Sequence, residues 1–275
     1  GLEFRRVLFR SDWFTETYCV RARYLQPFNG ARVEAIRARI AALSLEPELE
    51  AIALTSLVEA ADRVDSTVGV QMAYLKSWSR RSANPLTLRL PELLDGEGSA
   101  SCLDAREAAS LVEADVAYLD PPYNQHSYLG NYHVWETLVR WDRPEVYGVA
   151  CKRTDVRERG SAFNRRTAMA TAFAEVLDRV RARRLVVSFS DEGFHRPEAV
   201  LELLSGRGAV ASVAVDSKRY VGAQIVIHDP RGRRVGEVSH LRKREITWVV
   251  GPSDDAVRRA VAGVGSEPGP ALAAA

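Results

Sequence analysis

The sequence predicts an α/β protein with a helical N-terminal region, followed by a domain in which strands alternate with helices. Three observations lead to this prediction. The chain has 275 residues, of which 46% are hydrophobic and 27% are charged, so it can bury a sizeable core. Apolar side chains in its first third recur with the period of a helix. From residue 99 onward, short apolar runs alternate with helical patterns, which is typical of a sheet rich in parallel strands.

Two helices are predicted in the N-terminal region. Apolar residues lie three to four positions apart from residue 31 to 43, the spacing of an amphipathic helix, and Asn29-Gly30 before them is typical of a turn or cap. Pro47 suits the first turn of a second helix over residues 48–64. The segment after it is polar and basic without a clear period, and a glycine-containing turn at residues 95–98 is expected to end the region.

Strands in the second part are predicted where short apolar runs end at polar turns, and helices where apolar residues recur about every 3.6 positions. The predicted strands are residues 99–103, 115–119, 185–189, 210–215, 224–228 and 246–250. The predicted helices are residues 105–113, 167–182 and 197–204. Sheets of this kind bind their ligands at the carboxyl ends of the strands, so the polar residues that follow the strands are the first place to look for a site.

The two ends of the chain are expected to lie outside the folded domains. Residues 1–11 begin with Gly and show neither a helical period nor a cap, so they are interpreted as a non-native leader or the broken edge of a longer protein. The end of the chain is rich in Ala, Gly and Pro and is predicted to be flexible, apart from a short helix at 254–261. The predicted organisation is a leader (1–11), a helical region (12–98), an α/β domain (99–251) and a tail (252–275).

Composition points to a cytoplasmic protein. The three cysteines form no CxxC pair and leave an odd one over, which argues against a disulfide framework or a structural zinc site. No apolar run approaches the roughly 18 residues of a membrane span, and no charged-then-apolar leader opens the chain. A net charge of +2 is too balanced to indicate a nucleic-acid surface, so only the distribution of charge can do so.

One segment carries the chemistry of the sequence: the predicted strand 115–119 runs directly into Asp120-Pro121-Pro122-Tyr123. Two prolines fix φ, remove two backbone donors and push the residue before each of them into extended geometry. The result is a stiff loop that holds a carboxylate, free carbonyls and an aromatic face together. Such a loop suits a planar group with an exocyclic amine. A rigid turn with the tyrosine in the core is the alternative, which the preceding strand and Asp120 disfavour.

Leu119–Asn124 resembles the catalytic motif of amino-methyltransferases that use S-adenosylmethionine, specifically the Dam-like adenine-specific DNA methyltransferases. Three further segments resemble other parts of that family. Cys102–Ala105 matches its acidic position near the adenine of the cofactor, Leu185–Gly193 its next strand and turn, and Lys218–Gly222 its closing hairpin. The resemblance implies a Rossmann-like methyltransferase sheet, with residues 12–98 as a helical target-recognition insertion before the catalytic domain.

The resemblance also implies a mechanism. Asp120 and the carbonyl of Pro121 would accept the two hydrogens of an adenine amino group, which attacks the methyl group of S-adenosylmethionine without a covalent intermediate or a metal. The base must first be flipped out of the duplex, and Tyr123 would stack on it. The candidate catalytic residues are Asp120, Pro121, Pro122 and Tyr123, and the candidate cofactor contacts are Asp104 and Asp120.

One departure from the family concerns cofactor binding. The family opens with a strand and a Phe-x-Gly-x-Gly turn that cradles the methionine part of the cofactor, and nothing before Asp104 matches this pattern. Gly96-Glu97-Gly98 has the spacing but follows no predicted strand. The chain is therefore expected to lack the first two strands of the sheet, and a polypeptide that begins at Gly1 is expected to bind S-adenosylmethionine weakly or not at all.

Basic residues concentrate in two runs after the motif. Residues 152–166 hold six basic and two acidic side chains, and residues 216–244 hold eight basic and three acidic ones. A solvated surface explains either run by itself, but two runs beside a base-binding motif favour phosphate contact. The candidate DNA-binding residues are Lys218, Arg219, Arg233, Arg234, Arg242 and Arg244. The expected partners are double-stranded DNA and a cognate restriction endonuclease, with the protein itself a monomer.

The polar, aromatic segment Asn124–His133 follows the motif. His126 and His133 form neither an HExxH motif nor a pair with cysteine, so no metal is predicted. The segment is instead expected to line the base pocket or touch the DNA strand, with Tyr128 and Tyr132 as stacking residues.

Two other functions stay open at this point. A related amino-methyltransferase would act on RNA, cytosine or a protein glutamine through the same loop, although Asp rather than Ser at position 120 favours adenine over cytosine. The alternative from a different class is a catalytically inactive DNA-binding module that keeps the loop as a relic.

Overall fold

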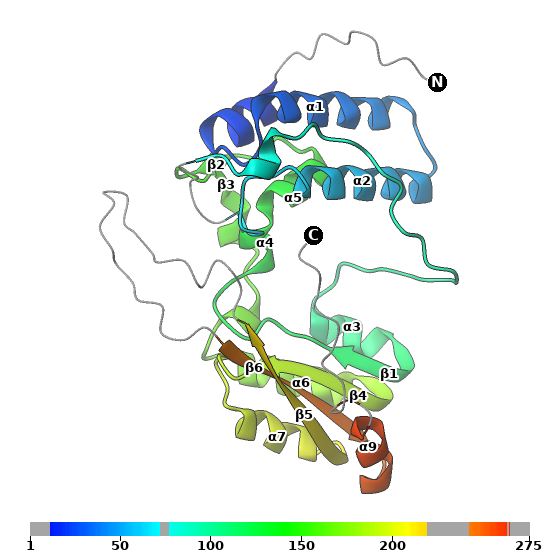
Figure 1. The fold of residues 1–275 in the computed structure, drawn as a ribbon. Coiled ribbons are helices and arrows are strands. Elements are labelled where there is room, and N and C mark those ends of the chain that lie inside the picture. Colours follow the sequence, from blue (N-terminus) through cyan, green and yellow to red (C-terminus); the bar gives the residue numbers. More distant parts are fainter. Residues whose placement is uncertain (1–11, 72–76, 219–241, 263, 265–275) are drawn as a thin grey trace, which may run out of the picture. The chain divides into compact units, whose positions relative to one another are not determined.

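A computed structural model describes residues 12–71, 77–218, 242–262 and 264. The described residues fall into two compact units (Figure 1). Unit 1 contains Gly1–Glu97 and Tyr128–Gly160, and unit 2 contains Gly98–Ser127 and Ser161–Ala274, in each case as far as they are described. Each unit is therefore built from two stretches of chain. No pattern in the sequence indicates that residues 128–160 join the helical unit.

Unit 1 is mainly helical, with one short antiparallel strand pair (Figure 1). Its helices are η1 (Thr15–Arg21), α1 (Pro27–Ala42), α2 (Pro47–Asp62), η2 (Arg80–Ala83), α4 (Tyr128–Asn131), α5 (His133–Arg140) and η3 (Thr154–Arg157). Its strands are β2 (Val146–Tyr147) and β3 (Lys152–Arg153). The two helices predicted from the apolar period are present as α1 and α2.

Helix α1 begins four residues earlier than predicted, and the prediction that Asn29-Gly30 forms a turn or cap is wrong. Asn29 is fully buried: its side chain donates to the carbonyl of Asn84 (2.8 Å) and accepts from the N–H of Leu86 (2.9 Å). A Cβ at Gly30 would collide with Sγ of Cys19. Both residues therefore serve packing inside the helix, because the glycine lets η1 approach α1 closely and the asparagine binds the irregular segment beyond α2.

Glu34 of α1 is buried, and its carboxylate accepts hydrogen bonds at the start of the first helical stretch of unit 1. The oxygens of Glu34 accept from the N–H groups of Asp12 (2.8 Å), Phe14 (2.9 Å) and Thr15 (3.1 Å), and from the hydroxyl of Thr15 (2.7 Å). The first N–H groups of a helix have no partner within it, and an anion is favoured there. Glu34 therefore supplies, from another helix, acceptors for N–H groups at the start of this helical stretch.

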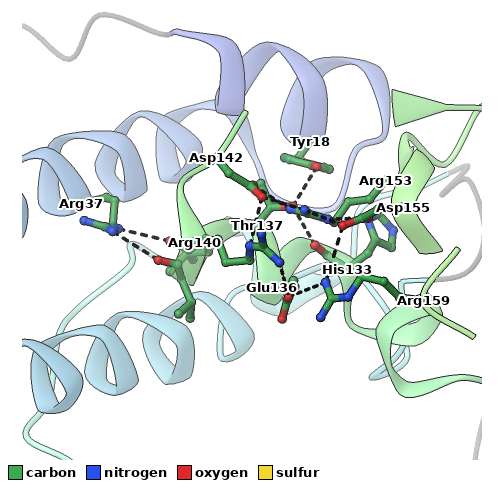
Figure 2. Close-up of polar contacts among 12 residues, drawn as sticks. Tyr18, Arg37, His133, Glu136, Thr137, Arg140, Asp142, Arg153, Asp155 and Arg159 are labelled. Carbon is green, nitrogen blue, oxygen red and sulfur yellow. Dashed lines mark hydrogen bonds and ion pairs between the residues drawn. The ribbon is translucent and has the colours of Figure 1, made fainter. Parts of the chain in front are cut away.

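A buried arginine joins β3 to helix α5 (Figure 2). Arg153 is 2% exposed, and its guanidinium donates to both oxygens of Asp142 (2.7 and 2.7 Å), both oxygens of Asp155 (3.0 and 2.9 Å) and the hydroxyl of Thr137 (3.2 Å). An arginine side chain has five N–H donors, so each of them is used. Arg159 extends the network by pairing with Glu136 at 2.8 Å.

Unit 2 is an α/β domain built on a four-stranded sheet of order β1-β4-β6-β5. The strands are β1 (Glu113–Leu119), β4 (Arg181–Ser190), β5 (Ala209–Lys218) and β6 (Arg242–Gly251). The helices are α3 (Ala105–Leu111), η4 (Ala162–Asn164), α6 (Met169–Arg179), α7 (Pro197–Ser205) and α9 (Asp254–Val261). The predicted α/β class is confirmed. No helix in the described part of either unit is long and apolar enough to cross a membrane.

The sheet differs from the expectation in three respects. It is mixed rather than rich in parallel strands, because β1 pairs with β4 in parallel while β6 runs antiparallel to both β4 and β5. The strand predicted at residues 99–103 is absent, and that segment is irregular up to the start of α3. The strand predicted at 224–228 lies outside the described residues. The other strands are longer than predicted, because polar and basic residues continue the pairing beyond each apolar run.

The core of unit 2 lies on one face of this sheet. Leu185, Val187 and Phe189 of β4 alternate toward it, and the pairing places Trp248 of β6 beside Val187. Phe173 of α6 meets the ring of Phe189 edge-on at 5.3 Å. Alternation along a strand sends every second side chain to the other face.

Candidate active site

Three segments lie at the same end of the strands in the sheet of unit 2. Strands β1 and β4 are parallel, so their carboxyl ends lie at the same end of the sheet, and the antiparallel strand β6 begins there. The loop Asp120–Tyr123 follows β1, the turn Asp191–Phe194 follows β4, and Lys243–Glu245 open β6. This is the end at which open α/β sheets bind ligands. The structure therefore places the loop predicted as catalytic at the expected end of its strand.

Tyr123 is fixed at its backbone and at its ring. Its carbonyl accepts from the N–H of Phe194 at 2.8 Å, which ties the loop to the turn after β4. A Cβ at Gly193 would lie 3.2 Å from Cβ of Tyr123, so the two backbones pack at a distance that favours glycine. Nζ of Lys243 donates to the phenol oxygen at 3.4 Å and lies 5.9 Å from the ring centroid. The ring thus has a defined orientation and is only half buried.

Asp120 remains accessible to solvent at the end of β1. Leu119 before it packs against the core, so Tyr118 projects from the opposite face of the sheet, and the side chain of Asp120 is hydrogen-bonded to Tyr118. Partial desolvation, and then the negative charge of Glu245, raise the pKa of Asp120. A hydrogen bond from Tyr118 and the positive charge of Lys243 act in the other direction. The carboxylate is thus held among charges that come from a different strand.

The segment just after the motif is held by a side-chain amide. Nδ2 of Asn164 donates to the carbonyls of Asn124 (2.8 Å) and His126 (3.0 Å), which uses both of its donors. Asn164 ends the short helix η4, so this contact joins the loop to a segment about 40 residues further on. The end of the loop predicted to be catalytic is thereby held by a side chain of unit 2.

The acidic residue predicted to contact the cofactor serves another purpose in the structure. Asp104 is the N-cap of α3 and accepts from the N–H of Arg106 at 3.0 Å. Its two oxygens also pair with the guanidinium of Arg106 at 2.8 and 3.0 Å. These hydrogen bonds lower the pKa of Asp104 to about 2. The role of Asp104 toward a cofactor stays a prediction.

Of the predicted DNA-binding residues, Lys218, Arg242 and Arg244 lie at the same end of the sheet as Asp120. Lys218 is paired directly across from Arg242, and all three side chains are exposed. Nε of Arg244 lies 3.4 Å from Asp216, which partly offsets its charge. The other three, Arg219, Arg233 and Arg234, lie outside the described residues.

The structure removes one residue from each of two expectations for the segments after the motif. His133 does not line a base pocket, because it is fully buried in unit 1, and burial lowers its pKa to about 4. Arg153 is not available to phosphate, because its donors are used within the network of Figure 2. Tyr128 and Tyr132, predicted to stack on bases, stack on each other with centroids 6.1 Å apart. The number of basic residues in the run 152–166 therefore overestimates how many of them are available to DNA phosphates.

The sequence reasoning missed four residues that shape the site. Lys243 and Glu245 belong to a strand whose predicted start was residue 246. Lys243 was counted in the basic run 216–244, and Glu245 lay between that run and the predicted strand, so neither was given a role in the site. Gly193 stood in a recognised turn without an assigned role. Asn164 carried no signal, because its partners are backbone carbonyls distant in sequence.

Comparisons with known proteins identify the family of the chain. Residues 6–199 match the model of the family described as D12 class N6 adenine-specific DNA methyltransferase. The Type II methyltransferase M.FokI of Planomicrobium okeanokoites is 32% identical over 192 residues, which are 67% of this chain and 29% of that protein. The modification methylase StsI of Streptococcus sanguinis is 29% identical over 190 residues, 66% and 29% of the two chains. The Type II methyltransferase M.NlaIII of Neisseria lactamica is 23% identical over 246 residues, 86% and 72% of the two. No solved structure matches.

A strand that ends in Asp-Pro-Pro-Tyr within an α/β domain, together with these relatives, defines a DNA-modifying methyltransferase class. The chain belongs to the D12 class of N6 adenine-specific DNA methyltransferases. It spans 29% of the length of the relatives M.FokI and StsI. Membership in a methyltransferase family implies a methyl donor, in general S-adenosylmethionine.

Proposed function

We propose that the protein transfers a methyl group from S-adenosylmethionine to the exocyclic amino group of a flipped-out adenine in double-stranded DNA. One observation carries this proposal. Asp120 and Tyr123 are held at the carboxyl end of β1, with the carboxylate accessible and the ring fixed but half exposed. Asp120 is thus placed to accept from an amine while Tyr123 stacks on the plane that bears it.

The residues of the loop address the main difficulty of the reaction. The lone pair of the adenine amino group is delocalised into the ring, so the amine is a poor nucleophile. Hydrogen bonds to Asp120 and to the carbonyl of Pro121 draw the nitrogen toward tetrahedral geometry and free its lone pair. The amine would take up the methyl group that S-adenosylmethionine supplies, the sulfur would keep the electrons of the broken S–C bond, and Asp120 would pass one amine proton to solvent. Positioning does most of the work.

The cofactor would supply an electrophilic sulfonium methyl group. The described residues fit it only in part: the carboxylate of Asp104 already accepts three hydrogen bonds from Arg106, which leaves little of its acceptor capacity. Asp120 faces the reacting amine and fits a contact with the methyl-bearing end. Asp104 and Asp120 stay the proposed contacts, and the mechanism above rests on the base-binding loop alone.

The proposed reaction is tested by product analysis. The protein is incubated with duplex DNA and S-adenosylmethionine that carries a deuterated methyl group, and the digested nucleosides are separated and weighed by mass spectrometry. We expect labelled N6-methyladenine, confined to adenines in one short sequence, from protein that carries the Phe-x-Gly-x-Gly segment of the family. Parallel reactions use RNA and the same DNA with Asp120→Asn protein. Label in N4-methylcytosine or in RNA, and none in adenine, would show that the substrate is assigned wrongly.

Lys218, Arg242 and Arg244 are proposed to contact DNA phosphates. Replacing all three with Ala should weaken binding to any duplex and flatten the fall of log K with log salt by up to about 2 to 3 units, since each contact contributes just under one. Sequence preference should change little, because phosphate contacts position rather than specify. Fluorescence anisotropy over a range of salt concentrations measures both quantities.

The matched control for this prediction is Arg259→Ala. Arg259 is an exposed arginine of unit 2 that pairs with Asp255 on α9, away from the start of β6. It should leave the salt dependence unchanged. An unchanged slope in the triple variant as well would mean that the three side chains are only a solvated surface.

The relatives named as modification methylases suggest a wider role. We propose that the protein acts as a cytoplasmic monomer and protects DNA against a restriction endonuclease of the same system. DNA methylated by the protein should then resist that endonuclease, whereas untreated DNA of the same sequence is cut.

A further inference from the structure

Two residues outside every recognised motif face the candidate site from the start of β6. Lys243 and Glu245 are half buried and alternate along the strand with the exposed Arg242 and Arg244. Lys243 and Glu245 form an ion pair. The core residue Ile246 follows them, so alternation turns the pair toward the face on which Asp120 projects.

The ammonium group of Lys243 has two partners that compete for its position. Its Nζ lies within hydrogen-bonding distance of the Tyr123 hydroxyl, at 3.4 Å, while Glu245 holds it from the strand side. Burial alone would lower the pKa of Lys243, but Glu245 and Tyr123 together raise it. The ammonium group of Lys243 is therefore protonated at neutral pH.

We propose that Lys243 is a positioning residue of the adenine site: it holds the Tyr123 ring in its stacking orientation and, with Glu245, sets the charge that faces Asp120. The proposal rests on the proposed function for the identity of the base, and on the geometry of unit 2 for the rest. Lys243 anchors the far end of the ring, while the backbone contact to Phe194 anchors the near end. A ring fixed at both ends needs no reorientation when a base arrives.

The proposal predicts that replacing Glu245 and replacing Lys243 shift the pKa of Asp120 in opposite directions. The groups that act on Asp120 are Glu245 and Lys243 from β6 and Tyr118 from β1. Glu245 raises the pKa of Asp120 and Lys243 lowers it. Removing the negative charge should therefore lower this pKa, and removing the positive charge should raise it. A purely structural pair would lose activity in both variants without moving the titration in opposite directions.

The test compares Lys243→Met, Lys243→Arg and Glu245→Gln with the unchanged protein. Arg259→Met is the control, because it removes a cation from an exposed ion pair on α9. The protein is labelled with carbon-13 in its aspartate carboxyl groups, and the Asp120 signal is assigned by its absence from Asp120→Asn. Its titration by NMR gives the pKa without requiring any activity. Single-turnover methylation is measured over the same pH range.

We expect Glu245→Gln to lower the pKa of Asp120, and Lys243→Met to raise it. The acid limb of methylation should move in the same two directions. Lys243→Met should also slow the rate at high pH, and Lys243→Arg should recover most of that loss. Arg259→Met should change neither quantity.

Shifts of Asp120 in the same direction in both variants, or no shifts, would overturn the proposal. Circular dichroism identifies a variant that fails to fold, and Glu245→Gln and Lys243→Arg then carry the comparison. If the opposite NMR shifts appear but no DNA is methylated, the positioning role stands and the proposed function fails.

Discussion

Replacing Tyr123 with Ala is expected to lower the single-turnover rate of adenine methylation roughly 5- to 150-fold, because stacking of a base on an aromatic ring contributes about 1–3 kcal/mol. Tyr123→Phe keeps the ring face and loses only the hydroxyl that meets Lys243. Its rate should stay within a few-fold of the unchanged protein at neutral pH. Rapid-quench assays with a labelled methyl donor measure both rates.

The Phe variant is also the control for folding, because Phe and Tyr fill the same space beside Gly193. Matching circular dichroism of the Ala and Phe variants would show that the loss of rate comes from the ring. If Tyr123→Ala methylates DNA within a few-fold of the unchanged protein, then Tyr123 is not the stacking residue.

Asp120→Ala should have the largest effect, a loss of roughly 10²- to 10³-fold, which is typical when one preorganised polar group is removed from a reacting centre. Asp120→Asn is nearly isosteric but replaces an acceptor oxygen with a donor group, so this variant should lose almost as much of the methylation rate. DNA binding should change little in either variant, since the carboxylate makes no phosphate contact in the proposed arrangement. Anisotropy measurements beside the rate assay separate the two effects.

Methylation should depend on pH through the ionisation of Asp120. Asp120 accepts most strongly from the amine, and can take up its proton, only as a carboxylate. Its pKa is raised by partial desolvation and by Glu245. Activity should therefore be full well above this raised pKa and fall as the pH drops through it. The fall should begin at a higher pH than an ordinary aspartate would give. A rate that stays flat down to the ordinary range of aspartate would contradict the role of an ionised Asp120.

Local signals predicted most of the fold. Pro47 and the apolar periods located α1 and α2, and the helices predicted in unit 2 are present with ends shifted by three residues or fewer. The errors have one physical cause, which is tertiary contact. Asn29-Gly30 imitates a turn in the sequence but serves close packing against Cys19. The direction of β6 was not predictable, because apolar runs record burial and carry no information on strand direction.

The candidate site was predictable where one stretch of chain carries its chemistry. Asp120 and Tyr123 lie three residues apart in a stiff loop, so the sequence shows them together. Lys243 reaches the same ring from 120 residues further on, and no local pattern records such a contact. The basic run 152–166 suggested more phosphate contacts than the structure allows, because the count includes Arg153, which is buried and has its partners inside the fold.

The separation of 120 residues between Tyr123 and Lys243 also bears on when the site can form during synthesis. Because β6 enters the sheet between β4 and β5, the sheet cannot close until the last described strand has been made. Ribosomes add about 5–20 residues per second, so the loop with Asp120 waits roughly 6 to 24 seconds for its final neighbours. During that interval β4 presents an unpaired edge to the cell. A nascent chain stalled before residue 242 would carry the complete Asp-Pro-Pro-Tyr sequence without the strand that orients it.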